Sequence, residues 1–302
     1  MARRQRLGGV TRERFDTPDG DFVDVDWLPG RPDAPLLLVL HGLEGSARSH
    51  YIGGLFRHAA ARGWRAGVLY FRSCSGEMNR LPRFYHSGDT GDLEHVVRTI
   101  AEREPGVRLG AVGISIGGNV LLKWLGEQGD AAPAPLAGAV AISVPFDLEA
   151  CARMMDQGLP KVLYTASFMR SFRVKTRAKA RAHPGFVDLR AALCATTFAA
   201  YDRAVTAPLH GFADEIDYWR RSSSARYLAH IRRPTLLLHA LDDPFIPSTS
   251  LPDPRTLPPS VRAEFVPIGG HVGFVEGAPW RAESWAERRA LDFLASVLDA
   301  VC

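Results

Sequence analysis

The sequence is poor in lysine, in cysteine and in long apolar runs. Only four of its 37 basic residues are lysines, and the formal net charge of the 302 residues is +4 at pH 7. The cations are spread along the chain among 33 acidic residues, whereas a nucleic-acid-binding protein concentrates positive charge on one face. The composition therefore argues against a nucleic-acid partner.

The four cysteines, Cys74, Cys151, Cys194 and Cys302, are far apart and form no C-x-x-C pair and no cluster with histidine at metal-ligand spacing. This pattern indicates reduced, structural thiols and predicts neither a disulfide framework nor a bound metal. No run of about 18 apolar residues is present, and no apolar secretory segment follows the basic N-terminal residues. We therefore expect a soluble, cytoplasmic protein without a transmembrane segment.

Short apolar runs recur along the chain and predict strands that are buried on both faces. Residues 22–27 differ, because apolar and acidic residues alternate there, which predicts a half-exposed strand. Helical patterns separate the runs, so the order of elements predicts a doubly wound, mostly parallel α/β sheet. The buried runs are 36–40, 66–71, 109–112, 137–144 and 235–240, with a strand-like segment at 262–266, and the helical patterns are 51–62, 90–104, 117–128 and 279–301.

This alternation stops between residues 147 and 230. We expect helices there and no strong strand, and we interpret 147–230 as a helical cap, or lid, inserted into a core made of 1–146 and 231–302. Active sites of such sheets lie at the carboxyl ends of the strands. The expected helices of the insertion are 148–157, 159–172, 189–198 and 214–229.

Ser115 is the candidate nucleophile. It lies in Gly113-Ile114-Ser115-Ile116-Gly117, between the strand at 109–112 and the helix at 117–128. The serine must turn sharply to project its hydroxyl, so glycines flank it, and the start of the helix favours developing negative charge. The G-x-S-x-G pattern also occurs in plain turns, but its position between a strand and a helix is typical of a nucleophile elbow.

A serine hydroxyl needs a base, and the base needs a carboxylate that orients it. His271 follows the last expected strand in a glycine-rich loop and is the candidate base, rather than an ordinary surface or core histidine. Asp242 and Asp243 both follow the strand at 235–240. Asp242 is preferred as the acid because it comes first, and Asp243 is the alternative.

The loop after the strand at 36–40 reads His41-Gly42-Leu43-Glu44-Gly45-Ser46. A loop at this position donates a backbone N–H to the oxyanion of acyl transfer, with a second from the residue after the serine. We therefore expect the N–H groups of Leu43 and Ile116 to form an oxyanion hole.

Three further features have two interpretations each. Cys74 is more readily a structural loop residue than a second nucleophile, and His86 more readily a hydrogen-bonded loop residue than a catalytic one. The basic residues between 170 and 181 favour a solvated helix face, with attraction to anionic lipid or substrate as the alternative.

Taken together, these segments resemble the bacterial YheT-like α/β-hydrolases, which are related to eukaryotic abhydrolase-domain esterases and phospholipases and to plant embryogenesis-associated proteins. The resemblance implies an α/β-hydrolase fold and hydrolysis of short- to medium-chain carboxylic esters, with Ser115, Asp242 and His271 in the Ser-Asp-His positions. Ser73 stands where relatives often have glycine, and Ile116 where they have leucine. The resemblance runs from about residue 10 to the C-terminus and rests on 41–46, 71–77, 85–88, 210–214, 242–245 and 269–274.

The expected function is that of a serine carboxylesterase that acts on a small-molecule ester through an acyl-serine intermediate, lipid-like esters being among the candidates. It needs no cofactor and no metal. An acyltransferase with the same residues and a non-catalytic ligand-binding protein on the same scaffold are the alternatives. The sequence leaves the oligomeric state open.

Overall fold

An eight-stranded sheet forms the centre of the computed structural model, which describes residues 9–277 and 283–298. The strand order is β1-β2-β4-β3-β5-β6-β7-β8. The six strands from β4 to β8 in this order are parallel to one another, whereas β1 and β2 are antiparallel to their neighbours. The strands are β1 (Thr11–Asp16), β2 (Phe22–Leu28), β3 (Leu36–Leu40), β4 (Arg65–Leu69), β5 (Leu109–Ile114), β6 (Leu136–Ile142), β7 (Thr235–Ala240) and β8 (Val261–Val266).

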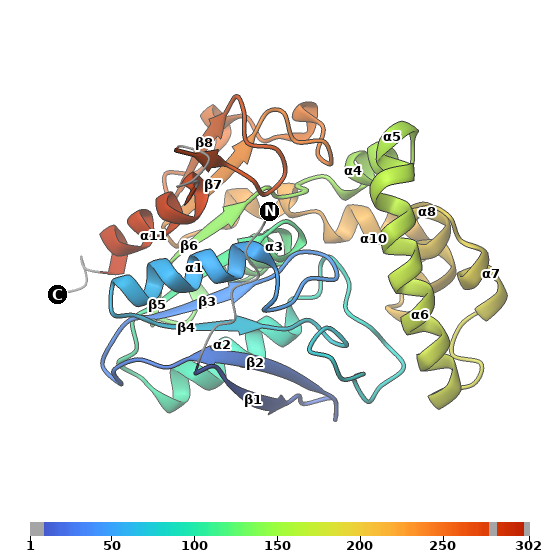
Figure 1. Cartoon of the computed structure of the whole chain (residues 1–302), viewed down its shortest axis with the longest axis horizontal. Coiled ribbons are helices and arrows are strands. Elements are labelled where there is room, and N and C mark those ends of the chain that lie inside the picture. Colours follow the sequence, from blue (N-terminus) through green and yellow to red (C-terminus); the bar gives the residue numbers. More distant parts are fainter. Residues whose placement is uncertain (1–8, 278–282, 299–302) are drawn as a thin grey trace.

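Helices cover both faces of the sheet, as Figure 1 shows. Helices α1 (His50–Ala61) and α11 (Trp285–Leu298) pack against one face, and α2 (Gly91–Arg103) and α3 (Ile116–Gln128) pack against the other. Alternate residues of a strand therefore enter different cores: Leu38 of β3 joins the α2 and α3 side, and Val39 joins the α1 and α11 side. This explains the continuous apolar runs and confirms the predicted doubly wound α/β fold.

Most of the expected elements are present within a few residues, and β7 has the bounds expected from the sequence. The C-terminal helix was expected at 279–301, of which 279–282 and 299–301 lie outside the described residues. Strand β1 was not expected, because its sequence, TRERFD, has a single buried residue, Phe15. A small hairpin of β9 (Val275–Glu276) and β10 (Glu283–Ser284) was also not expected.

The expectation that β2 is half-exposed was wrong. Its alternating acids, Asp24 and Asp26, are buried because β1 lies beside them at the sheet edge. The register places Arg14 opposite Asp24 and Arg12 opposite Asp26, and each arginine binds its carboxylate through two nitrogens. The acidic face is therefore covered by ion pairs and not by solvent.

Between β6 and β7 the described chain forms helices joined by short loops, with no strand from 143 to 234. These helices lie together beside one end of the sheet (Figure 1) and form two apolar clusters of their own. No helix among the described residues combines the length and apolar character needed to cross a membrane. The elements are α4 (Leu148–Met155), α5 (Gly158–Pro160), a π-helical turn η2 (Lys161–Thr165), α6 (Ala166–Ala182), α7 (Leu189–Cys194), α8 (Phe198–Tyr201), a second π-helical turn η3 (Asp202–Thr206), α9 (Ala207–Leu209), α10 (Glu215–Ser222) and η4 (Ser224–His230).

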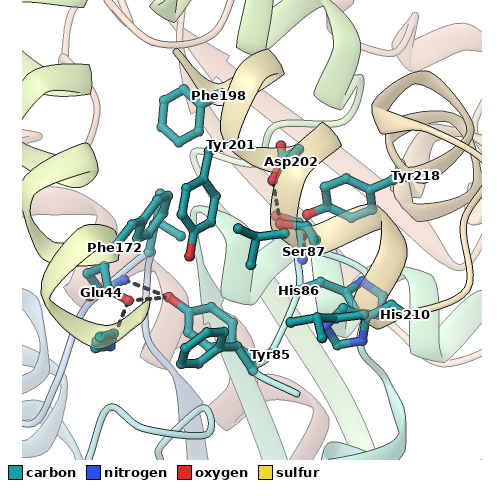
Figure 2. A pocket seen from close by; sticks show the side chains of 16 residues that line it. Glu44, Tyr85, His86, Ser87, Phe172, Phe198, Tyr201, Asp202, His210 and Tyr218 are labelled. Carbon is teal, nitrogen blue, oxygen red and sulfur yellow. Dashed lines mark hydrogen bonds and ion pairs between the residues drawn. The ribbon is translucent and has the colours of Figure 1, made fainter. Parts of the chain in front are cut away.

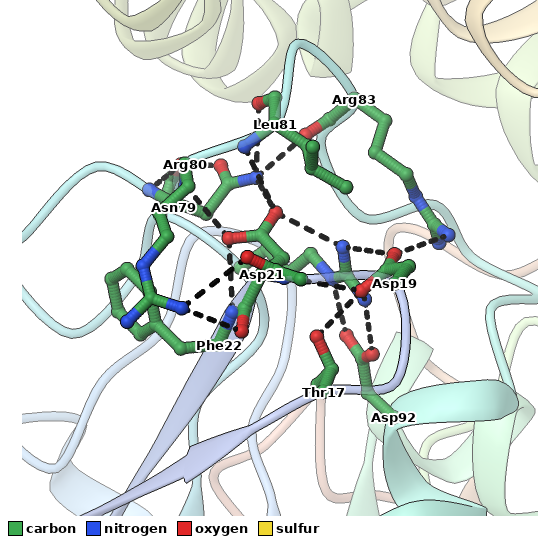
Figure 3. A network of polar contacts seen from close by, with 12 residues as sticks. Thr17, Asp19, Asp21, Phe22, Asn79, Arg80, Leu81, Arg83 and Asp92 are labelled. Atoms are coloured by element: carbon green, nitrogen blue, oxygen red, sulfur yellow. Dashed lines mark hydrogen bonds and ion pairs between the residues drawn. The ribbon is translucent and has the colours of Figure 1, made fainter.

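A network of polar contacts, which includes Asp19, Asp21, Asn79 and Asp92 (Figure 3), fixes the long loop that follows β4. Arg72 is 3% exposed, and its guanidinium binds the carboxylates of Asp19, Asp21 and Asp92 at 2.7–3.0 Å. Asp21 also accepts a hydrogen bond of 2.6 Å from the Asn79 amide. This network joins the β1–β2 turn, the loop and helix α2.

Helix α6 is attached to the same loop by a buried lysine. Lys179 donates to the backbone carbonyls of Asn79 and Leu81 and to the Asn79 amide oxygen at 2.6–2.9 Å. Burial lowers the pKa of Lys179 to about 8. The loop therefore holds the inner face of α6 at a fixed position relative to the sheet.

Candidate active site

Ser115 lies between β5 and α3, at the carboxyl edge of the sheet. Its backbone has a positive φ, with φ 55° and ψ −122°, which a non-glycine residue adopts only at a cost in strain. Its N–H bonds the carbonyl of Ile142 on the adjacent strand β6 at 2.8 Å, and its carbonyl accepts from the N–H of Asn119 at 3.1 Å. These bonds on both sides hold the strained turn that exposes the hydroxyl.

The flanking glycines are required by close backbone contacts. A Cβ atom at Gly117 would lie 2.5 Å from the carbonyl oxygen of Leu40 on β3, and one at Gly113 would lie 2.5 Å from the Gly117 carbonyl oxygen. Both distances are shorter than van der Waals contact allows. The turn can therefore pack against β3 only when these positions lack a side chain.

His271 contacts Ser115 and a carboxylate at the same time. Its Nε2 is 3.0 Å from the Ser115 Oγ, and its Nδ1 is 2.7 Å from the Asp243 Oδ2. The Asp243 side chain is fully buried, and its other oxygen accepts the N–H of Phe245 at 2.8 Å. A carboxylate at Nδ1 favours the tautomer whose Nε2 is free to accept a proton from the serine hydroxyl.

The preference for Asp242 over Asp243 as the partner of His271 was wrong. Asp242 is exposed, and its Oδ1 accepts the backbone N–H groups of Gly269 at 2.9 Å and Gly270 at 2.8 Å. After β7 the chain turns, with the Asp243 N–H bonded to the Ala240 carbonyl. The turn directs the later aspartate inward, toward the imidazole, and leaves Asp242 to bind the loop that carries His271.

The loop after β3 places Leu43 beside Ser115 through hydrogen bonds on both sides of it. The N–H of Gly42 donates to the Tyr51 hydroxyl at 2.9 Å, and the N–H of Glu44 donates to the Tyr85 hydroxyl at 3.0 Å. In the described residues, no hydrogen bond from the N–H of Leu43 or of Ile116 is found. Both donors are thus available to an oxygen bound near Ser115.

His41 supports this loop from within the core. Its Nε2 accepts the N–H of Phe71 at 3.2 Å, so its Nδ1 carries the proton and donates to the Gly42 carbonyl at 2.7 Å. Complete burial lowers the pKa of His41 to about 4, so the ring stays neutral. His41 is a structural residue of the loop.

A contact between helix α6 of the inserted segment and this loop could not be expected from the sequence (Figure 2). Glu44 has a positive φ of 55°, and its carboxylate accepts from the Lys175 ammonium at 2.7 Å, from the Tyr85 hydroxyl at 3.0 Å and from Ser171. Ser171 and Lys175 follow Glu44 by 127 and 131 residues. The residue next to Leu43 is therefore held by helix α6.

Cys74 lies at the same contact, and the Lys175 ammonium donates to its sulfur at 3.4 Å. Burial nevertheless raises the pKa of the Cys74 thiol to about 11, so it stays protonated near neutral pH. This favours the structural interpretation of Cys74. Cys74, Cys151 and Cys194 are free thiols, and Cys302 lies outside the described residues.

A cavity of about 360 Å³ opens above Ser115 and His271. One wall comes from the loops at the sheet edge, including Leu43 and Ile116, and the opposite wall comes from helices of the segment inserted between β6 and β7. Apolar side chains dominate the wall formed by the inserted helices, so Ser115 and His271 face a largely apolar space. This wall is lined by Leu148, Cys151, Ala152, Met155, Phe168, Phe198, Asp202, Tyr218 and Trp219.

A smaller chamber of about 80 Å³ adjoins this cavity beyond Leu43 and Ser87 (Figure 2). Asp202, on the π-helical turn η3, lines both spaces and accepts hydrogen bonds from Thr206 at 2.6 Å and Trp219 at 2.9 Å. Complete burial raises the pKa of Asp202 to about 7. Near neutral pH this wall therefore carries a carboxyl group that is partly protonated.

His86, Asp89 and His210 are the one group among the described residues whose ligand atoms lie close enough to hold a metal, within 4.8 Å of one another. The Arg83 guanidinium already binds the Asp89 carboxylate at 2.5 Å. Burial lowers the pKa of His86 to about 4 and that of His210 to about 3. Since the Asp89 carboxylate already binds the Arg83 guanidinium, we assign no metal to this group. His86 lies in a loop, and its ring packs on that of His210.

The fold and the serine at the end of β5 define the class of protein as an α/β hydrolase. Comparison with known families agrees, because residues 35–278 match the model of the α/β-hydrolase fold family. The chain belongs to this family.

Two relatives and one solved structure are similar to this chain, and the first relative places it more narrowly, whereas the solved structure supports the fold alone. It is 40% identical over 293 residues to YheT of Escherichia coli (strain K12), whose name suggests an esterase, with 95% of this chain and 85% of that protein covered. It is 28% identical over 296 residues to the mouse phospholipase ABHD3, covering 95% of this chain and 72% of that protein. A solved structure of the Pyrococcus furiosus esterase Pf2001 has a TM-score of 0.63 at 18% identity, with 96% and 91% of the two chains covered. The resemblance to YheT-like hydrolases is thus confirmed.

Proposed function

We infer that the protein is a serine carboxylesterase. The observation that carries this inference is the continuous contact from Asp243 through His271 to Ser115, with the serine facing an apolar cavity. Buried carboxylate, imidazole and hydroxyl in this order are the arrangement that activates a serine. Esterase and lipase names among the relatives support an ester as the substrate.

In the proposed reaction, Ser115 Oγ attacks the ester carbonyl while His271 Nε2 takes its proton. The carbonyl oxygen becomes an oxyanion, which the N–H groups of Leu43 and Ile116 bind. The imidazolium, held by Asp243, then protonates the leaving alcohol, and the acyl group stays on Ser115. Water, deprotonated by His271, releases the acid and restores the serine.

The size of the cavity supports a short- to medium-chain substrate. Its volume of about 360 Å³ lies near the lower end of the range typical of small-molecule sites, about 300–1,000 Å³. Its apolar lid wall suits an acyl chain. The phospholipase and monoacylglycerol lipase names of two relatives keep lipid-like esters among the candidates, and residues 147–230 are proposed to act as the lid over them.

The test is hydrolysis of p-nitrophenyl butyrate by Ser115→Ala. We expect kcat/KM to fall by roughly 10⁴-fold or more and labelling by a fluorophosphonate probe to disappear. Ser87→Ala is the matched control, because Ser87 lines the same cavity but makes no hydrogen bond with His271 in the described part of the chain, and its backbone N–H still donates to the Tyr218 hydroxyl in the variant. A folded Ser115→Ala variant with parental activity would refute the assignment.

A panel of p-nitrophenyl esters of graded acyl length tests the substrate class. We expect kcat/KM to reach its maximum among short and medium chains and to fall for long chains that exceed the cavity. Adding an alcohol acceptor to the same reactions separates hydrolysis from acyl transfer, because transfer yields a new ester in place of the free acid.

A further inference from the structure

The outer face of the lid carries exposed apolar side chains next to cations without counter-ions. Of the nine large apolar side chains that are exposed in the described residues, five lie between 159 and 174. The most exposed of these are Leu159 (74%), Val162 (70%) and Leu163 (60%). Their spacing of i, i+3 and i+4 places them on one side of the α5–η2 segment.

The same segment is cationic throughout. Residues 157–187 contain seven lysines and arginines and no aspartate or glutamate. Three of the seven are used internally: Lys175 binds Glu44, Lys179 binds the loop carbonyls, and Arg173 donates to the Ala195 carbonyl. These three inward-facing cations therefore have hydrogen-bond partners within the protein.

The outward-facing cations of this segment have no such partners. Arg170, Arg177 and Arg181 are exposed, and no ion pair or hydrogen bond of these side chains is found within residues 9–277 and 283–298. With Val174 they form a stripe at i, i+4, i+7 and i+11 along α6. The lid thus presents an apolar tip at 159–163 that continues into an arginine stripe, which we call the lid face.

The lid face lies next to the entrance of the cavity. Tyr164 packs on Phe245 with ring centroids 4.5 Å apart, and Phe245 packs on His271 at 4.4 Å. Thr165 donates to the carbonyl of Met155, which lines the cavity. Phe168, on α6, also lines the cavity, so the helical segment that carries the lid face contacts the cavity as well.

We propose that the lid face docks the protein on an anionic lipid surface. Apolar side chains flanked by arginines on one side of a helix are the pattern that inserts into the interface of an anionic bilayer. A second copy of the chain is the less favourable occupant, because a symmetric dimer through this face would bring the two arginine stripes together. The proposal concerns binding, so it does not depend on the reaction at Ser115.

The experiment is co-sedimentation of the full chain with vesicles of phosphatidylglycerol or of phosphatidylcholine, at low and at high salt. We expect the protein to bind phosphatidylglycerol vesicles at low salt. Binding should be weaker at high salt, and binding to phosphatidylcholine vesicles should be weaker than binding to phosphatidylglycerol vesicles. The combined variant Leu159→Ser, Val162→Ser, Leu163→Ser should weaken binding by roughly tenfold or more.

The charge variant Arg170→Gln, Arg177→Gln, Arg181→Gln should weaken binding to phosphatidylglycerol by roughly 10- to 100-fold. All of these substitutions are at exposed sites, so we expect folding, checked by circular dichroism, and hydrolysis of a soluble ester to be unchanged.

The single variant Val162→Ser is compared with Val275→Ser as its matched control, because the two valines are 70% and 72% exposed and lie in different parts of the fold; Val162→Ser should weaken binding and Val275→Ser should leave it unchanged. The proposal would be overturned if the protein did not bind vesicles, or if it bound both lipids equally. It would also be overturned if the triple serine variant and the triple glutamine variant both bound like the parent. So would a dimer, seen by light scattering, that the apolar variant dissociates while vesicles bind neither form. Loss of esterase activity in Ser115→Ala with vesicle binding retained would leave this proposal standing.

Discussion

The two neighbouring aspartates after β7 offer a sharp test of the proposed mechanism. Asp243 accepts from His271 and from the Phe245 N–H with its two oxygens, at 2.7 and 2.8 Å. In Asp243→Asn, an amide oxygen that stays on Phe245 turns the amide NH₂ toward His271 Nδ1. The imidazole must then carry its proton on Nε2, where it cannot accept the proton of Ser115.

The opposite orientation of the introduced amide is also unfavourable, because its NH₂ group would then face the N–H of Phe245, donor against donor. We therefore expect kcat/KM of Asp243→Asn for p-nitrophenyl butyrate to fall by about 10⁴-fold, which corresponds to about 5.5 kcal/mol of transition-state stabilisation. The rate of fluorophosphonate labelling of Ser115 should fall with it.

Asp242→Asn is the matched control. A single Asp242 oxygen accepts both glycine N–H groups of the His271 loop, and an amide oxygen can accept the same two bonds. We expect its kcat/KM to stay within about tenfold of the parent, because only the charge assistance of these bonds is lost. A large loss in Asp242→Asn together with a small loss in Asp243→Asn would refute the reasoning.

Three further predictions concern the loop and the buried charges. Glu44→Gln keeps the shape but loses the charge that Lys175 binds, so kcat should fall by roughly tenfold, with KM nearly unchanged in steady-state assays, if Glu44 positions the Leu43 N–H. Arg72→Met leaves the buried carboxylates of Asp21 and Asp92 without their partner and should lower the free energy of unfolding in urea by about 3–5 kcal/mol. Burial raises the pKa of Glu287 from 4.5 to about 7, so the stability of the parent should fall as pH rises between these values, and Glu287→Gln should be more stable by about 2–3 kcal/mol at pH 8, measured by urea unfolding.

Each of these has a result that contradicts it. A rise in KM without a change in kcat would assign Glu44 to substrate binding and not to positioning. Arg80→Met is the control for Arg72, because the Arg80 side chain is 48% exposed and its ion pair with Asp16 should contribute about 1 kcal/mol or less; an equal loss in both variants would contradict the buried network. For Glu287→Gln, a gain as large at pH 4.5 as at pH 8 would show that the carboxyl does not titrate with the raised pKa.

The sequence by itself determined the layers of the fold and the segments that meet at the sheet edge. Continuous apolar runs such as 36–40 predict strands that are buried on both faces. The helical patterns between these runs predict a doubly wound sheet. Because the carboxyl ends of parallel strands share one edge, Ser115 and His271 could be placed together from local patterns alone.

Only the tertiary structure decided which aspartate binds His271, how β2 is covered and how the lid contacts Glu44. The choice between Asp242 and Asp243 depends on the direction of a turn after β7, and the burial of Asp24 depends on arginines of a strand with too few apolar residues to be recognised. The contact of Lys175 with Glu44 joins residues 131 positions apart. The periodicity of a sequence indicates which face of a single helix or strand is apolar. These contacts depend on how separate elements pack against each other, and a local sequence pattern does not indicate that packing.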